Sequence, residues 1–386
     1  MRPARLDAVA AAGAVAALGV VYALVVPFGL PYDEPVHWLN VVHIADTGTL
    51  PRIGAPDVGY EAVQTPLTYV LDAALAAPLD ALGASEETTQ RLVRVLNVGW
   101  LLVLLFALAA VTRRLVPGIS RGRSILAGAL VSGSSIIVAV GSSVENDIAA
   151  AGLGVLALVQ FIDAWDDPGW KRSGAAGLLL GVAFLAKPAV WPLGIVWVLA
   201  LVVRRRPKQL AAFALLGLLV SGWWIVRNWV LYESLTGNNA VKANGDEWPP
   251  VGFHGVSSLV DYVRAAVTFL WLPVEYWRNT VSAPAWIEAL VVVGTIGLLA
   301  LLVLELRRQR LDGVRLLVLA SATTAVLAWV FADVFVEGAS FRLTYSGVLP
   351  LWAWAVAVAV SRGRPYAWAL VAGLVVIHVF ALASVA

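Results

Sequence analysis

Long apolar runs alternate with short charged clusters over almost the whole chain. An apolar run of about 20 residues is long enough to cross the hydrocarbon core of a membrane as a helix. The pattern predicts eleven crossings, near residues 8–30, 90–112, 124–141, 148–164, 174–187, 189–203, 210–232, 284–306, 314–336, 343–361 and 366–386. We therefore expect an all-α, polytopic membrane protein.

The first apolar run follows a short basic N-terminus and superficially matches a secretory signal peptide. It extends from Ala8 to Leu30, which is longer than the roughly 7–15 apolar residues of a signal sequence. The run is therefore predicted to be the first membrane helix.

The basic residues indicate the orientation of the chain. With the N-terminus in the cytoplasm, most of the 27 lysines and arginines fall in the inner loops. Examples are Arg113, Arg121, Arg204, Arg308 and Arg362. Cytoplasmic loops of membrane proteins carry such an excess of positive charge. The opposite orientation would reverse it, so we predict an N-terminus in the cytoplasm and a plasma-membrane location.

Residues 174–203 leave the inner side and return to it within a stretch too short for two full spans. The turn between the two legs, at Lys187-Pro188, should therefore lie below the outer surface, inside the protein. A cation at that depth is costly unless it faces a cavity or an anion.

Two outer regions are long, residues 31–89 and 233–283. The segment Ser257–Trp277 in the second is apolar but contains charges, and a crossing there would invert the later inner loops. We expect it to lie in the membrane interface or to re-enter from the outer side, because its aromatics, Tyr262, Phe269, Trp271, Tyr276 and Trp277, suit the lipid headgroup region. No repeat or soluble terminal domain is apparent, so residues 1–386 are predicted to form one membrane domain.

Composition agrees with this class. The 386 residues are 60% hydrophobic and 13% charged, whereas soluble domains carry about 25% charged residues. The net charge of +2 gives no argument for a nucleic-acid partner. The absence of cysteine excludes disulfides and thiolate chemistry. Lysine is rare relative to arginine, which favours a GC-rich, bacterial coding background.

Most acidic residues fall on the predicted outer side. Asp33-Glu34 follows the first span, and Pro35 suits the start of a helix. In that helix Asp33, His37 and Asn40 would share a face, and the helix would lie along the membrane surface. Taken alone, the two acids are equally well explained as a solvated helix start.

Two more acidic sites lie on the same side: Glu61, with Gln64 close behind it, and the turn Glu145-Asn146-Asp147. Both are also explained by ordinary charge near helix starts. A metal site built from Asp33, His37 and His43 is conceivable, but histidines on such faces are usually only hydrogen-bonded. We therefore predict no required metal.

At these residues the chain resembles the GT-C glycosyltransferases, which take sugars from polyprenyl-phosphate carriers. The relatives include dolichyl-phosphate-mannose protein mannosyltransferases and lipid A aminoarabinose transferases. Asp33-Glu34 resembles their first acidic pair. Glu61, Gln64, Pro66, Leu67 and Tyr69 resemble "E-x-H-Q-P-P-L-x-Y", with departures at Val63 and Thr65. The other matching pieces are Glu145-Asn146-Asp147, Leu185-Ala186-Lys187, Trp223 to Tyr232 around Arg227-Asn228-Trp229, and Phe341-Arg342-Leu343.

The resemblance implies a catalytic base at the first acidic motif and basic residues on the donor phosphate. An acceptor hydroxyl would attack the anomeric carbon, with a carboxylate as general base. Asp33 is the expected base, and Glu34 or Glu61 would position hydroxyls or exchange roles with it. Cations must stabilise the leaving phosphate, and the topology brings Lys187, Arg227 and Arg342 to the outer side. His37, Gln64, Glu145 and Asp147 are expected to position substrate.

Many relatives have a soluble outer domain after the last span. The chain shows none, which favours a cell-envelope glycolipid or glycan as acceptor over a protein. Two other functions stay open. A secondary transporter or lipid flippase would place ionisable groups near the bilayer midplane, and a non-catalytic membrane scaffold would tolerate Asp33→Asn and Glu61→Gln.

Overall fold

The computed structural model describes residues 3–167, 169–245, 252–273, 276–277, 282–309, 311–335 and 340–385, with side chains from residue 8 onward. Parts of the second outer loop thus lie outside the described residues. Every regular element within these ranges is a helix. The α-helices are α1 (Pro3–Val25), α2 (Glu34–Thr47), α3 (Leu67–Ala81), α4 (Glu86–Leu115), α5 (Arg121–Ser132), α6 (Ser135–Gly141), α7 (Asp147–Asp166), α8 (Trp170–Ala186), α9 (Trp191–Val203), α10 (Pro207–Tyr232), α11 (Asn238–Ala243), α12 (Val256–Thr268), α13 (Ala285–Arg308), α14 (Gly313–Phe335), α15 (Tyr345–Ser361) and α16 (Arg364–Ala383), and three 3₁₀ turns are η1 (Tyr60–Val63), η2 (Pro188–Val190) and η3 (Phe341–Thr344).

Each predicted span coincides with a helix or a pair of helices, but eleven full crossings are not confirmed. In the described part of the chain, 8 helices are long and apolar enough to cross a membrane, or up to 9 if a bent pair counts as one span. The predicted span 124–141 is that pair, α5 and α6, bent by 72°. The legs α8 and α9 have 17 and 13 residues, shorter than a full span, as their short stretch of sequence predicts.

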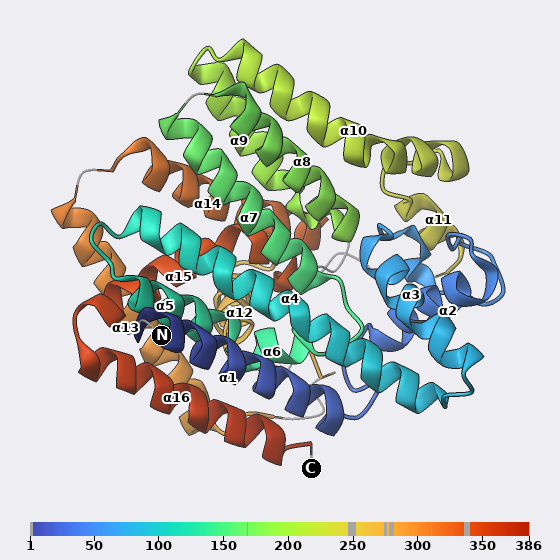
Figure 1. Cartoon of the computed structure of the whole chain (residues 1–386), viewed down its shortest axis with the longest axis horizontal. Coiled ribbons are helices and arrows are strands. Elements are labelled where there is room, and N and C mark those ends of the chain that lie inside the picture. The colour runs from blue at the N-terminus through green and yellow to red at the C-terminus, as the bar shows by residue number, and fades with distance from the viewer. Residues whose placement is uncertain are drawn as a thin grey trace.

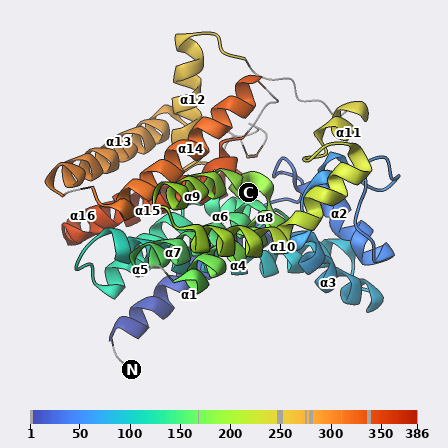
Figure 2. The same cartoon turned by 90° about the horizontal axis from the view of Figure 1, so that it is seen from above.

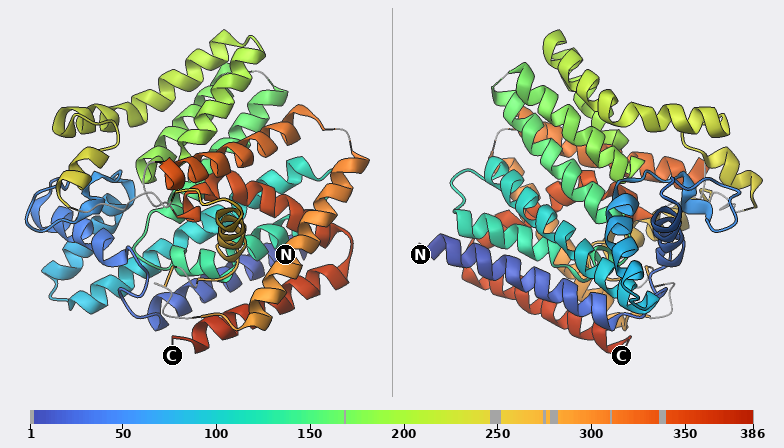
Figure 3. Two further views of the ribbon diagram at one scale, coloured as in Figure 1. Left: turned by 180° about the vertical axis from the view of Figure 1, so that it is seen from behind. Right: turned by 45° about the vertical axis from the view of Figure 1, so that its right-hand side comes forward.

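The long helices run roughly along one direction, and their connections gather at two ends (Figure 1). The turns from α9 to α10, from α13 to α14 and from α15 to α16 lie at the end where the chain begins. Helices α2, α3 and α11 lie at the opposite end, and the view from behind shows the same separation (Figure 3). The arginine-rich turns therefore lie far from the acidic outer loop.

Helix α15 forms the centre of the bundle, and 89% of the span that contains it is buried inside the protein. It packs against α14, α5, α7, α13 and α4. By contrast, only 17% of α10 is buried, and many of its leucines and valines are exposed. Such a surface suits contact with lipid tails rather than water.

Glycines allow α8 and α10 to approach closely. A Cβ atom at Gly177 would lie 2.0 Å from the carbonyl oxygen of Phe213, and one at Gly181 would lie 2.7 Å from that of Gly217. Small residues spaced four apart are a common way to pack membrane helices backbone to backbone. This packing holds the short leg α8, and therefore its outer end at Lys187, in place.

The bend between α5 and α6 leaves backbone groups inside the bundle that need partners. The Gly133 carbonyl lies 2.7 Å from His378 Nε2, and the other ring nitrogen of His378 lies 2.9 Å from the Tyr22 hydroxyl. Tyr22 also contacts Ser135 at 2.8 Å. Tyr22 on α1 and His378 on α16 thus provide hydrogen-bond partners for polar groups at the break between α5 and α6.

The expected headgroup position of the Ser257–Trp277 aromatics is wrong for most of them. Helix α12 projects from one side of the bundle (Figure 2), but the four aromatics after it are buried in the main core. Their exposed fractions are 6% for Phe269, 7% for Trp271, 1% for Tyr276 and 1% for Trp277. The chain after α12 turns inward, because these rings bury more apolar surface against α13 and α15 than the interface offers.

Helix α2 packs on α3 and is more buried than a helix lying on a membrane surface. Trp38 and Val41 form a small apolar cluster with Tyr69 and Val93. The opposite, polar side of α2 is also buried, with His37 and Asn40 almost inaccessible. This polar side faces the acidic residues described next.

Candidate active site

Helix starts bring the acidic residues together. Asp33 precedes α2, whose first turn contains Pro35, and its carbonyl accepts the Val36 and His37 amides. Glu145 and Asp147 flank Asn146 at the start of α7. The positive end of a helix dipole stabilises carboxylates at both places. We call Asp33, Glu145 and Asp147 the acidic cluster.

The turn at Lys187 follows directly from the sequence. Helix α8 ends at Ala186, and Lys187 is extended with φ −155° and ψ 132°. A residue before proline disfavours the helical conformation, so Pro188 ends α8 and starts the short turn η2. Lys187 is 8% exposed, and its Nζ lies 2.9 Å from Asp147. The buried cation thus has the anion that its depth requires.

Arg342 joins all three members of the acidic cluster. Its guanidinium lies 2.7 Å from Asp33 Oδ2 and 3.0 Å from both Glu145 Oε1 and Asp147 Oδ2. The Tyr276 ring lies under the same guanidinium at 4.7 Å. Arginine suits such a site because its planar donors serve several carboxylates at once.

His37 supplies a third positive charge. Its Nε2 lies 3.1 Å from Glu145, and its Nδ1 lies 2.5 Å from the Tyr69 hydroxyl. Burial lowers the pKa of His37, but the nearby carboxylates, Glu145 above all, outweigh burial and raise this pKa to about 9. Burial raises the pKa of Glu145, but the cations outweigh it, so this pKa falls below its usual range. Three carboxylates therefore face three cations, and the cluster is close to neutral.

Asp33 is fully engaged. Its Oδ1 accepts a hydrogen bond from Tyr60 at 3.0 Å, and its Oδ2 accepts from Arg342. Its side chain is 16% exposed, more than that of Glu145 or Asp147. Asp33 is thus the cluster carboxylate that substrate can reach most easily, although both of its oxygens already accept hydrogen bonds.

Glu34 points away from the cluster. Arg94 donates to both of its carboxylate oxygens, at 2.6 and 2.5 Å. The Val144 and Gly29 amides donate to the same two oxygens at 3.0 and 3.1 Å. Glu34 is 0% exposed, so it has no free oxygen for a substrate hydroxyl. The structure does not bring Glu34 to the predicted substrate position.

Glu61 differs from Glu34 in having an unoccupied carboxylate oxygen. Its Oε2 is buried and has no hydrogen-bond partner, although Asn40 holds its backbone carbonyl at 2.9 Å. Burial is the main cause that raises the pKa of Glu61 to about 7. A free carboxylate oxygen with a pKa near neutrality has the properties of a general base. Glu61 is in η1, which ends at Val63, directly before Gln64.

A pocket of about 390 Å³ opens beside Lys187. Gln64, Lys187 and Asn228 are among its polar lining residues, and Phe184, Trp191, Trp224 and Leu343 are among its apolar ones. The Gln64 side-chain oxygen is also buried without a partner. The pocket thus joins a cation next to the acidic cluster to an apolar wall.

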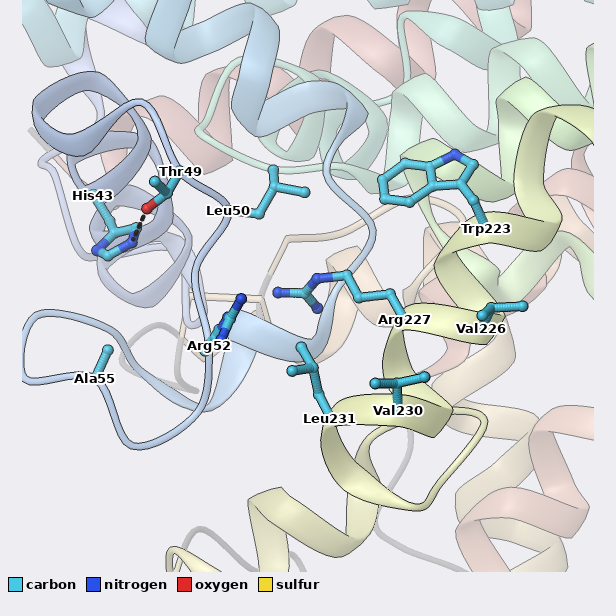
Figure 4. Close-up of a pocket in the computed structure, with 10 residues that line it drawn as sticks. All are labelled: His43, Thr49, Leu50, Arg52, Ala55, Trp223, Val226, Arg227, Val230 and Leu231. Carbon is cyan, nitrogen blue, oxygen red and sulfur yellow. Dashed lines mark hydrogen bonds between the residues drawn. The ribbon is translucent and has the colours of Figure 1, made fainter.

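The three predicted phosphate-binding cations do not all converge. Lys187 and Arg342 meet at Asp147. Arg227 instead donates to the Pro51 carbonyl at 2.6 Å and lies over the Trp224 ring at 4.4 Å. It lines a second pocket, on the side of α10 that faces the first outer loop (Figure 4).

One group of residues has the geometry for a metal ion. Ligand atoms of Asp33, His37 and Glu145 lie within 4.8 Å of one another. However, Arg342 already binds Asp33 and Glu145, and the raised pKa of His37 keeps its ring protonated below about pH 9. A protonated imidazole cannot ligate a metal. This donor set fits a metal poorly, and the absence of a metal requirement stays a prediction.

Sequence reasoning missed Arg94, Tyr60 and the contact of Tyr276 with Arg342. Arg94 had a detectable signal, because it is a cation one turn inside a predicted span, and such a residue needs a partner. Tyr60 and Tyr276 had no comparable signal, since tyrosine is common at membrane interfaces.

The chain is similar to one protein family in sequence and to several solved structures in fold. A family described as "Dolichyl-phosphate-mannose-protein mannosyltransferase" matches residues 74–229. No curated protein matches the sequence. The crystal structure of ArnT from Cupriavidus metallidurans bound to undecaprenyl phosphate is similar, with 16% identity, a TM-score of 0.61, and coverage of 96% of this chain and 62% of ArnT.

The archaeal oligosaccharyltransferase AglB from Archaeoglobus fulgidus, in complex with an inhibitory peptide and a dolichol-phosphate, is also similar. The identity is 14%, the TM-score is 0.56, and the match covers 98% of this chain and 56% of AglB. The apo form of the A. fulgidus enzyme gives 13% identity and the same TM-score, 0.56. The chain thus spans less than two thirds of the length of these enzymes.

These likenesses define the class of protein: a multi-pass membrane protein with the GT-C fold. Within that class, the chain is similar to glycosyltransferases related to the protein mannosyltransferases and ArnT.

Proposed function

We propose that this protein transfers a sugar from a polyprenyl-phosphate carrier to an acceptor hydroxyl of a cell-envelope glycolipid or glycan. The observation that carries the proposal is the acidic cluster bound to Lys187 and Arg342, with Lys187 also lining the 390 Å³ pocket. Such a site offers carboxylates for a hydroxyl and a cation for a phosphate, beside an apolar wall for a lipid tail.

The donor phosphate binds at Lys187 in this proposal. Lys187 lines the pocket and contacts the cluster only through Asp147, so it is free to exchange that contact for a phosphate oxygen. The first isoprene units then lie against Trp191 and Trp224. Arg342 keeps the acidic cluster together and adds positive potential behind the leaving group.

The transfer step requires one base. The acceptor oxygen forms a bond to the anomeric carbon, the bond from that carbon to the phosphate oxygen breaks, and the phosphate leaves with the electron pair. The hydroxyl proton passes to a carboxylate. We assign this role to Glu61, because its Oε2 has no partner, whereas both oxygens of Asp33 are occupied. Asp33 and Gln64 orient sugar hydroxyls, and Glu34 fixes the segment before Glu145.

The site faces the extracytoplasmic side of a bacterial plasma membrane in this proposal. The arginine-rich turns lie at the opposite end of the bundle from α2 and α3 (Figure 1), and positive loops stay in the cytoplasm. A transporter is less well supported, because the cluster lies at helix starts at one end of the bundle rather than at its middle. A scaffold needs no paired buried charges.

The test is release of label from radiolabelled polyprenyl-phosphate sugars by the purified chain in nanodiscs. Asp33→Asn, Glu61→Gln and Lys187→Gln are the variants, and Glu87→Gln, at an exposed surface pair, is the control. Release by wild type and control but not by Glu61→Gln would support the enzyme and the base. Release by Glu61→Gln but not by Asp33→Asn would return that role to Asp33. A folded wild type that releases no label from a panel of donors would contradict the proposal.

A further inference from the structure

The second pocket has a volume of about 760 Å³ and lies between the first outer loop and the outer end of α10. We call it the arginine groove. It is lined by His43, Thr49, Leu50, Arg52 and Ala55 from the loop side, and by Trp223, Val226, Arg227, Val230 and Leu231 from α10 (Figure 4).

Arg52 and Arg227 face each other across the arginine groove (Figure 4). Within the described residues neither guanidinium forms an ion pair, whereas Arg94 and Arg342, also at the outer end, each bind carboxylates. Two neighbouring cations repel each other, and an anion placed between them turns this repulsion into attraction. Phosphate suits the position, because arginine binds its oxygens in pairs.

Backbone contacts hold this arrangement in place. Arg227 donates to the Pro51 carbonyl at 2.6 Å, and the Ile53 amide donates to the Tyr232 hydroxyl at 3.2 Å. The two contacts flank Arg52 and tie its loop to α10. The groove is therefore a built surface that needs no rearrangement to present both arginines.

The wall of the groove is suited to a lipid tail. Trp223, Val226 and Val230 are 44%, 63% and 73% exposed on the same side of α10 as Arg227. Alkyl chains cover such apolar surface in a membrane, while the charged end stays at the arginines. The charge and the apolar wall together select an amphiphile with an anionic head.

We propose that the arginine groove binds the phosphate-bearing headgroup of the acceptor lipid, an inference that rests on the function proposed above. The donor occupies the other pocket, which lies across Trp224 and contains Lys187. Asp33, directly before α2 at the cluster, and His43, on α2 at the groove, are separated by roughly 15 Å along the helix axis at about 1.5 Å per residue. The acceptor therefore carries its phosphate well away from the reacting hydroxyl, as a phosphorylated oligosaccharide lipid does.

Native mass spectrometry of the full chain in detergent tests this with two probes, phosphatidic acid and undecaprenyl phosphate. Phosphatidic acid should bind more tightly than phosphatidylcholine. Arg52→Gln should weaken its binding about tenfold, the loss expected for one charge-assisted hydrogen bond. Arg91→Gln, which removes the same charge from an exposed pair on α4, should leave it unchanged. Both probes should bind one protein together.

The outcomes separate the two proposals. Equal binding of phosphatidic acid by wild type and Arg52→Gln would overturn the arginine groove, whether or not label is released from a donor. Mutual exclusion of the two probes would assign the groove to the donor and overturn the acceptor role. Arginine-dependent binding together with no cleavage of any donor would leave the groove established as an anionic-lipid site and would contradict the glycosyltransferase and, with it, the acceptor.

Discussion

Glu34 and Arg94 form a buried ion pair, and Glu34→Gln tests whether this pair is structural. The side chains are 0% and 3% exposed, and Arg94 donates to both carboxylate oxygens. Glutamine keeps the size of the side chain but leaves the guanidinium without a counter-charge, with only backbone carbonyls as acceptors. Breaking one side of a buried pair costs about 3–5 kcal/mol. We expect Glu34→Gln to lower the free energy of unfolding by that amount.

Two further variants isolate the cause. Glu87→Gln breaks a similar pair with Arg91, but there the side chains are 73% and 52% exposed, so the cost should be about 0–1 kcal/mol. Combining Glu34→Gln with Arg94→Met removes the uncompensated charge and should recover part of the lost stability, although the Ala23, Val26 and Pro27 carbonyls then lose Arg94 as a donor. Denaturant unfolding in mixed micelles, followed by tryptophan fluorescence, measures all of them.

Activity measured well below the unfolding transition completes the test. Glu34 accepts the Val144 amide directly before Glu145, so the variant should turn over more slowly but still bind donor. If Glu34→Gln unfolds like the wild type and yet releases no label, Glu34 acts on the substrate itself. That result would refute the structural role.

Four further outcomes are expected. The rate of transfer should rise with pH through about 7, because the Glu61 base must be ionised and its pKa is raised to about 7; a pH–rate profile flat between 6 and 8 would exclude Glu61 as base. Burial raises the pKa of Asp72 from 3.8 to about 7, so folding favours its protonated form and the wild type loses stability as the pH rises through this range; Asp72→Asn should lose less between pH 5 and 8 in thermal unfolding. Gly177→Val should destabilise the protein by about 1–3 kcal/mol, because its Cβ meets the Phe213 carbonyl, whereas Gly99→Ala, with open space around it, should unfold like the wild type. Turnover should survive dialysis against a chelator, since the cluster has its own cations, and activity restored only by added divalent metal would contradict this.

Helix positions could be predicted because lipid imposes one strong requirement, the burial of backbone polar groups within apolar helices. Lys187 illustrates how far this reasoning extends. Two legs too short to span required a buried turn, a buried cation required an anion, and the structure supplies Asp147. The bend between α5 and α6 was not predictable in the same way, since its stabilising contacts come from His378, far along the chain.

For the site, the sequence could not predict the direction in which each side chain points. Asp33 and Glu34 are adjacent, so a helical turn of about 100° separates their directions, and only packing decides which one faces the cluster. Glu34 turns to Arg94, which sequence reasoning overlooked. Arg227 reaches the correct end of the bundle but the other side of α10. A topology locates a residue along the membrane normal, whereas contacts decide which residues it meets.

The bridge from Arg342 to Asp33 has a consequence for biogenesis. The two residues are 309 positions apart, so the ribosome has made most of the chain before the guanidinium exists. Until η3 and α15 enter the bundle, Asp33 lacks this counter-charge, and Glu145 and Asp147 have only the partners supplied earlier, His37 and Lys187. Completion of the site therefore waits until η3 and α15 have been inserted, and a chain arrested before α15 should be inserted yet inert.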